Sequence, residues 1–157
     1  MYLDESWRGS DQDLAQLADL HALSTVCLVR APITNKGLAH LADVPNLMSL
    51  TLAETKVTDD GLAVLRPLKQ LMRIHLEGTV NGLEFTDKAL QHLPKTRMFY
   101  QPIVLYGRGF TDAITTRLDG LGPIFELHLV DTALSKPAVE ALKKRGGDFM
   151  KVHVTPE

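Results

Sequence analysis

Aliphatic residues recur along this chain at a fixed spacing that divides it into similar blocks. Leu17, Leu41 and Leu65 lie 24 residues apart, and each begins a block with the same order of apolar and polar positions. The clearest block runs over residues 41–64. A fixed period of this length is typical of proteins that stack one small structural unit on the next.

Each block contains a short segment in which apolar and other residues alternate. The apolar positions of the first three blocks are Leu23, Val26 and Leu28, then Leu47, Leu50 and Leu52, then Leu71, Ile74 and Leu76. Later blocks keep the last two positions, as Ile103/Leu105, Leu127/Leu129 and Val152/Val154. This alternation predicts short strands with one buried face, and it indicates that the other face of the sheet is open to solvent.

A polar turn follows each strand segment and predicts where a helix begins. Thr34-Asn35, Thr58-Asp59 and Thr86-Asp87 occupy the same phase of three blocks. A threonine or aspartate at this point can cap the amides of a following helix, and Leu62, Leu65 and Leu68 continue at helical spacing. We therefore expect one short helix after each strand. Gly107-Arg108-Gly109 replaces the usual post-strand segment and predicts a distorted fourth block.

One block is too small to fold alone. About seven aliphatic side chains at roughly 2 kcal/mol each do not offset the ordering of 24 residues, which costs roughly 1.5 kcal/mol per residue. Neighbouring blocks must therefore share a core, with each strand pairing to the next in a parallel ladder. Strands pack about 4.8 Å apart and helices roughly 8 to 10 Å apart, so the strands are expected on the concave side.

These motifs resemble the leucine-rich repeat family, in its short bacterial form L-x-x-L-x-L-x-x-T-x-[VI]-T-D-x-G-L-x-x-L, close to the F-box-associated type. The resemblance implies an α/β right-handed solenoid, or horseshoe, of about six repeats, with a parallel sheet on the concave face and short helices on the convex face. It predicts a single domain over residues 1–157, divided into a partial N-terminal repeat 1–16, repeats 17–40, 41–64, 65–92, 93–117 and 118–141, and a C-terminal strand 142–157.

Composition excludes some classes of partner and indicates a cellular compartment. The formal net charge of -2 lacks the basic excess of a nucleic-acid binder, and no apolar run approaches the roughly 18 residues of a membrane span. The first residues lack the features of a secretory signal, and the single cysteine, Cys27, cannot form an internal disulfide. We expect a cytoplasmic protein that binds neither nucleic acid nor membrane.

The predicted open face becomes more polar along the chain. The first two full strands present small uncharged side chains, whereas the later ones present charge, imidazole and a tyrosine. Tyrosine and arginine are enriched at sites that dominate protein binding. We predict a non-catalytic module that binds a protein partner, helped by the inserted loop 80–84, through Arg73, His75, Glu77, Tyr106, Glu126, His128, Lys151 and His153.

Two alternatives remain at this stage. His128 and His153 are predicted on adjacent strands with Glu126 on the same face, which would suit a small metal-dependent protein or enzyme. No H-E-x-x-H or C-x-x-C motif supports that alternative, so the expectation is no metal, no other cofactor and no catalytic residue. The other alternative is a scaffold that self-associates through its open edge strands.

Overall fold

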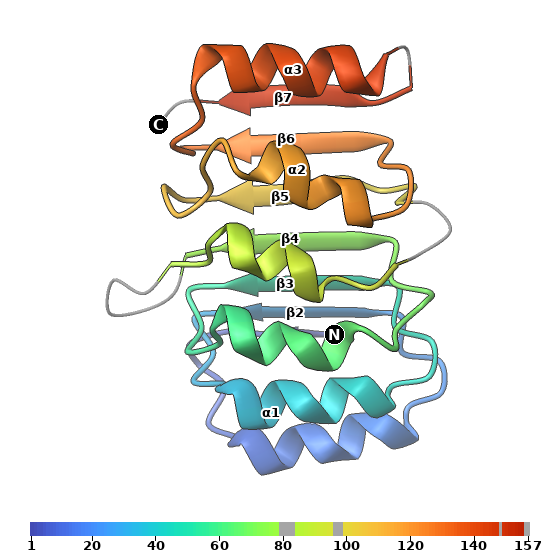
Figure 1. The fold of residues 1–157 in the computed structure, drawn as a ribbon. Helices are drawn as coiled ribbons and strands as arrows, with labels where there is room; N and C mark the ends of the chain where they lie inside the picture. Colours follow the sequence, from blue (N-terminus) through green and yellow to red (C-terminus); the bar gives the residue numbers. More distant parts are fainter. Residues whose placement is uncertain (79–83, 96–98, 148, 156–157) are drawn as a thin grey trace.

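The computed structural model describes residues 1–78, 84–95, 99–147 and 149–155, and within them the chain forms a single open sheet. The strands of this sheet are β1 (Tyr2–Leu3), β2 (Thr25–Val29), β3 (Ser49–Ala53), β4 (Arg73–Glu77), β5 (Ile103–Tyr106), β6 (Glu126–Val130) and β7 (Lys151–Thr155). All neighbouring pairs are parallel, and the strands follow one another in chain order (Figure 1). The predicted parallel ladder is confirmed.

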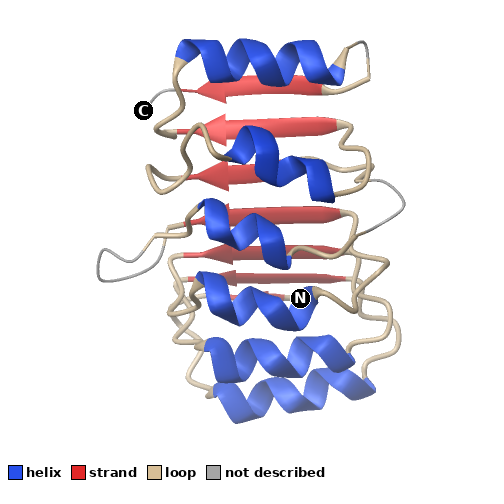
Figure 2. Ribbon diagram, in the orientation of Figure 1, coloured by secondary structure: helices blue, strands red, loops and turns tan. Residues whose placement is uncertain are grey.

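Short helical segments connect the strands. They are η1 (Asp11–Asp19), α1 (Asn35–Ala39), η2 (His40–Asp43), η3 (Asp59–Leu65), η5 (Asp87–His92), α2 (Ile114–Arg117), η6 (Leu118–Gly120) and α3 (Lys136–Gly146), with η marking 3₁₀ geometry. Figure 2 shows these helices on one face of the sheet, and no described helix covers the other face. The protein is therefore an α/β structure built of strand and short-helix units, which is compatible with a solenoid-like arrangement.

The core lies between the sheet and the helices. In β3 and β4 the inward residues Leu50, Leu52, Ile74 and Leu76 are completely buried, and their partners in the parallel register are also inward-facing. The alternation seen in the sequence is thus the alternation of buried and solvent-facing side chains along each strand. Complete burial of a leucine contributes roughly 2 kcal/mol, so the aligned aliphatic rows are the main source of stability.

A ladder of polar contacts joins successive turns on the helical side. In each step, an aspartate or asparagine in one turn contacts the backbone N–H and the hydroxyl of the threonine or serine that begins the next turn. The pairs are Asp11 with Thr34, Asn35 with Thr58, Asp59 with Thr86, Asp87 with Thr111, and Asp112 with Ser135. Neighbouring units are therefore joined by these hydrogen bonds as well as by the pairing of their strands.

The helix caps predicted from the sequence are present at several turns. The Thr34 and Thr86 hydroxyls accept from the N–H of Lys36 and Lys88, and the Ser135 hydroxyl accepts from Ala138. At Thr58 the side chain makes no cap hydrogen bond, because its hydroxyl instead accepts from the Asn35 amide of the preceding turn.

The residue two positions after the last inward strand residue has a positive φ in several units. Arg30, Glu54 and Asp131 have φ of 52°, 49° and 46°, and Gly107 takes the corresponding place in the fourth unit with φ of 121°. Glycine reaches such values without the steric penalty that a side chain brings. The Gly107 segment is therefore a turn adapted to this position, while β5 stays in register with both neighbouring strands.

Within the part of the chain that the structure describes, no helix combines the length and the apolar character that crossing a membrane requires.

Candidate functional site

The uncovered face of the sheet, called here the open face, consists of three rows of side chains that cross the strands. The central row is Cys27, Thr51, His75, Val104, His128 and His153. A second row contains Thr25, Ser49 and Arg73, with Glu126 and Lys151 in register further along. The third row is Val29, Ala53, Glu77, Tyr106, Val130 and Thr155. These rows place every predicted binding residue on this face.

The open face changes character between β3 and β4, as the sequence indicates. Thr25, Ser49 and Thr51 are small and uncharged, whereas β4 presents the exposed Arg73 together with His75. Ala53 departs from the prediction, because it is 3% exposed although it lies in an outward row. The charged part of the face therefore begins at β4.

Three side chains of β6 and β7 converge at the C-terminal end of the central row. His128 Nε2 donates a hydrogen bond of 2.9 Å to Glu126 Oε1, and His153 Nε2 lies 3.0 Å from the same oxygen. The two imidazole rings have centroids 4.6 Å apart and are tilted by 40°. The predicted placement of these residues side by side on adjacent strands is confirmed.

The electrostatics of this cluster favour an ionised carboxylate. The hydrogen bond from His128 is the largest influence that lowers the pKa of Glu126, and His128, His153 and Lys151 lower it further by Coulomb attraction. An ionised carboxylate next to two imidazoles can accept hydrogen bonds from a partner, or it can join two neutral imidazole nitrogens in offering three electron pairs to a cation.

A smaller pair occupies β4. His75 Nε2 is 3.2 Å from Glu77 Oε2, but the geometry is not that of a hydrogen bond, and this buried nitrogen has no hydrogen-bond partner. Burial is the main cause that lowers the pKa of His75, although Glu77 opposes the shift. Val104 separates His75 from His128 in the central row, so the two clusters are distinct.

The remaining predicted binding residues surround these clusters. Tyr106 is half-buried and lies in register between Glu77 and Val130. Lys151 is exposed at the start of β7, with its Nζ 5.8 Å from the centroid of the Phe125 ring. The open face thus combines cationic, anionic and aromatic groups within neighbouring strands.

The inserted loop 80–84 was predicted to help the open face bind its partner. Residues 80–83 of this loop lie outside the described residues. Glu84 is described, and its Oε2 accepts a hydrogen bond of 2.8 Å from the Gly109 N–H. Through this contact the end of the insertion meets the turn of the next unit.

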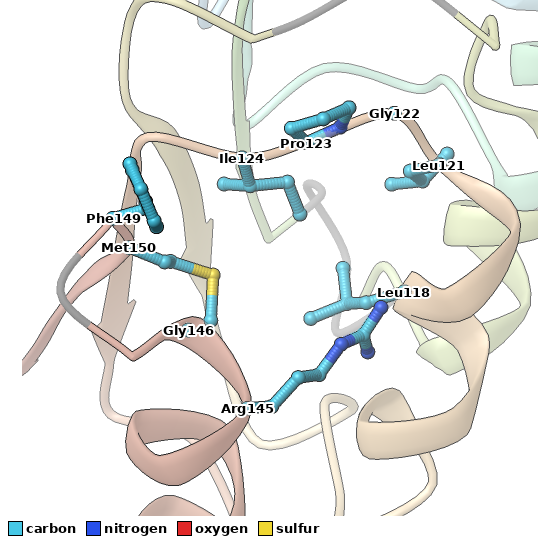
Figure 3. Close-up of a pocket in the computed structure, with 9 residues that line it drawn as sticks. All are labelled: Leu118, Leu121, Gly122, Pro123, Ile124, Arg145, Gly146, Phe149 and Met150. Carbon is cyan, nitrogen blue, oxygen red and sulfur yellow. The ribbon is translucent and has the colours of Figure 1, made fainter.

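A hollow near the C-terminal end of the helical side was not predicted from the sequence. It has a volume of about 310 Å³ and separates the 121–124 segment from the end of α3 (Figure 3). Leu118, Ile124 and Met150 contribute apolar lining, and Arg145 at its edge is paired with Asp119 at 2.9 Å. Such a hollow arises from residues far apart in the sequence, so the pattern within one block could not predict it.

Comparisons with known proteins add no assignment to this geometry. No protein-family model matches the chain. A search of curated proteins also gave no match. The open face is accordingly the feature from which a function has to be inferred.

Proposed function

We propose that this chain is a leucine-rich-repeat protein of the horseshoe type, and that it is a non-catalytic module that binds a protein partner through the sheet. In this proposal the open face is the concave face, and the anchors are the eight residues on β4 to β7 predicted from the sequence. A cytoplasmic location belongs to the same proposal and has its support in the single Cys27.

The observation that carries this proposal is the register of β4 to β7. It gathers Arg73, Glu77, Tyr106 and Lys151 on one uncovered face, where a partner can reach them together. Tyrosine buries a large area at a low entropic cost and also forms hydrogen bonds, and arginine is likewise enriched among the residues that dominate binding. Mixed charge on neighbouring strands favours a partner with complementary charges.

A comparison of bound proteins tests the proposal. Purified chain would be immobilised, and proteins retained from cell extract would be identified by mass spectrometry for the original sequence and for the double variant Arg73→Ala/Tyr106→Ala. The control is Lys36→Ala/Lys88→Ala, which removes two exposed charges from the helical side. We expect a partner retained by the original chain and the control, with at least tenfold weaker affinity for the open-face variant.

Unchanged affinity of the double variant would contradict the proposed surface. Equal loss in the open-face variant and in the helical-side control would also contradict it, since the effect would then not depend on the sheet.

Self-association through β7 is a second candidate, and one observation favours it. Val154 occupies an inward position in register with Leu129, yet Val154 is 47% exposed whereas Leu129 is completely buried. An edge strand that carries an uncovered apolar side chain is a surface to which the strand of another molecule can pair. Light scattering over a concentration series should then show mass increasing for the original chain but not for Val154→Lys. A monomer at all concentrations would exclude this candidate.

A further inference from the structure

The cluster at the end of the central row has a donor set suited to a metal ion. Glu126, His128 and His153 can each offer one ligand atom, and these three atoms lie within 4.8 Å of one another. They come from two strands held in register over their whole length, because Glu126 pairs with Lys151 and His128 pairs with His153. The backbone therefore fixes the positions from which the ligands approach.

Two of the three distances between ligand atoms are close to those of a tetrahedral site, and all three lie within 4.8 Å. Zinc binds imidazole nitrogen and carboxylate oxygen at about 2.0 to 2.2 Å, which places two ligands of a tetrahedron about 3.3 Å apart. In the cluster, Glu126 Oε1 is 2.9 Å from His128 Nε2 and 3.0 Å from His153 Nε2. To hold an ion, side-chain rotations would have to lengthen these two contacts by a few tenths of an ångström and bring the two imidazole nitrogens to a similar separation.

The protonation of His128 is also compatible with metal binding. The Nε2 of His128 now donates to Glu126, so an ion that takes this nitrogen must replace that hydrogen. A neutral imidazole can carry its single proton on Nδ1 and leave Nε2 free to coordinate. Metal binding would thus exchange one hydrogen bond for three coordinate bonds.

The position of the cluster leaves one side of the site accessible. His153 is half exposed, and no described helix covers this face of the sheet. Three protein ligands with a solvent-facing fourth position are the arrangement in which zinc keeps a water or takes a ligand from another molecule. Lys151 is the nearest cationic neighbour in the register, and its ammonium group lies over the Phe125 ring.

We infer that Glu126, His128 and His153 form a binding site for one divalent transition-metal ion of the zinc type, with a fourth coordination position open to solvent or to a partner side chain. Two imidazoles with one carboxylate favour zinc, cobalt or nickel over magnesium and calcium, which prefer oxygen ligands. This site goes beyond the proposed protein binding and does not depend on it.

Titration of tag-free protein with zinc tests the inference. The original chain should bind one zinc ion, measured by calorimetry and by competition with a chromophoric chelator. His128→Ala and His153→Ala should each weaken the affinity by at least about tenfold, since even the loss of a supporting group around a metal site has an effect of that order. Cobalt should give visible absorption bands of tetrahedral intensity in the original chain, and these bands should be lost in both variants.

The chain provides a matched control on the same face. His75 lies beside Glu77 as His128 lies beside Glu126, but Thr51 and Val104 are its neighbours on the adjoining strands. His75→Ala should therefore bind zinc like the original chain. Circular dichroism would confirm that each variant is folded.

Three results would overturn the inference. They are the lack of stoichiometric zinc uptake at micromolar concentrations, unchanged uptake in the double variant His128→Ala/His153→Ala, and equal weakening by His75→Ala. None of them bears on the retention experiment with Arg73 and Tyr106, so the metal site and the protein-binding proposal can fail separately.

Discussion

The Asp59 carboxylate holds the threonine that begins the next turn, 27 residues further along the chain. One oxygen accepts the Thr86 backbone N–H at 3.0 Å, and the other accepts the Thr86 hydroxyl at 2.6 Å. Hydrogen bonds to an ionised acceptor are stronger than those between neutral groups. Because equivalent pairs recur along the helical side, this contact is one step of a ladder that connects the units.

Replacing Asp59 with alanine should destabilise the protein. The change leaves the Thr86 N–H and hydroxyl without their acceptor in a partly buried position, which we expect to cost about 2 kcal/mol. The free energy of unfolding measured with urea checks this expectation. Asp60→Ala is the matched control, because Asp60 is the exposed neighbour in the same turn.

Asp59→Asn should be milder than Asp59→Ala. Asn35 already performs the same task in the preceding turn, where its Oδ1 accepts from the Thr58 N–H at 2.9 Å and its Nδ2 donates to the Thr58 hydroxyl at 2.9 Å. Equal destabilisation by Asp59→Ala and Asp60→Ala would show that the ladder does not contribute to stability.

The same ladder predicts a loss of stability in acid. The backbone N–H and the hydroxyl of Ser135 lower the pKa of Asp112 below its ordinary value of 3.8. Between the lowered pKa of the folded protein and the ordinary pKa of the unfolded chain, the unfolded chain binds more protons. The free energy of unfolding therefore rises with pH in this window. The contribution of Asp112 to the free energy of unfolding is therefore complete above pH 3.8. It is lost as the pH falls through the lower pKa that Asp112 has in the folded protein.

Urea unfolding measured at several pH values checks this prediction. Asp112→Asn should show a shallower decrease in stability below pH 3.8 than the original chain, because an amide cannot be protonated there. Identical acid profiles for the two proteins would contradict the assigned role of the carboxylate.

Gly109 should not tolerate a side chain. A Cβ at this position would lie 2.2 Å from the Phe85 carbonyl oxygen, so the backbone of one unit would have to shift relative to the next. We expect Gly109→Ala to cost about 1 to 3 kcal/mol, the range typical of overpacking, measured by thermal or urea unfolding. Gly120→Ala is the control, because a Cβ there meets nothing within 4 Å. A Gly109→Ala variant as stable as the control would contradict the close approach of these units.

Much of the sheet could be predicted because apolar residues alternate with other residues along each strand. Ile74 and Leu76 alternate with His75, and the next block repeats this order, so counting residues gives both the inward side and the register. The same counting places His128 beside His153. Periodicity therefore predicts which side chains share a face.

The hydrogen bonds between successive turns could not be predicted from the periodicity. Asp59 follows Thr58 and was interpreted as part of a helix cap, whereas its partner is a threonine of the next unit. The signal was the recurrence of Asp or Asn after the Thr of successive turns, but its meaning depends on how far one turn lies from the next. Similarly, nothing in the residue type of Glu54 indicates its positive φ.

Along strands such as β4, successive residues are alternately enclosed in the core and accessible on the open face. Thiol labelling tests it most directly, with Cys27→Ser as background and a single cysteine introduced by Arg73→Cys or Ile74→Cys. In the structure Arg73 is exposed and the adjacent Ile74 is completely buried. Position 73 should be labelled rapidly under native conditions, and position 74 only after unfolding. Similar labelling rates at the two positions would contradict this alternation.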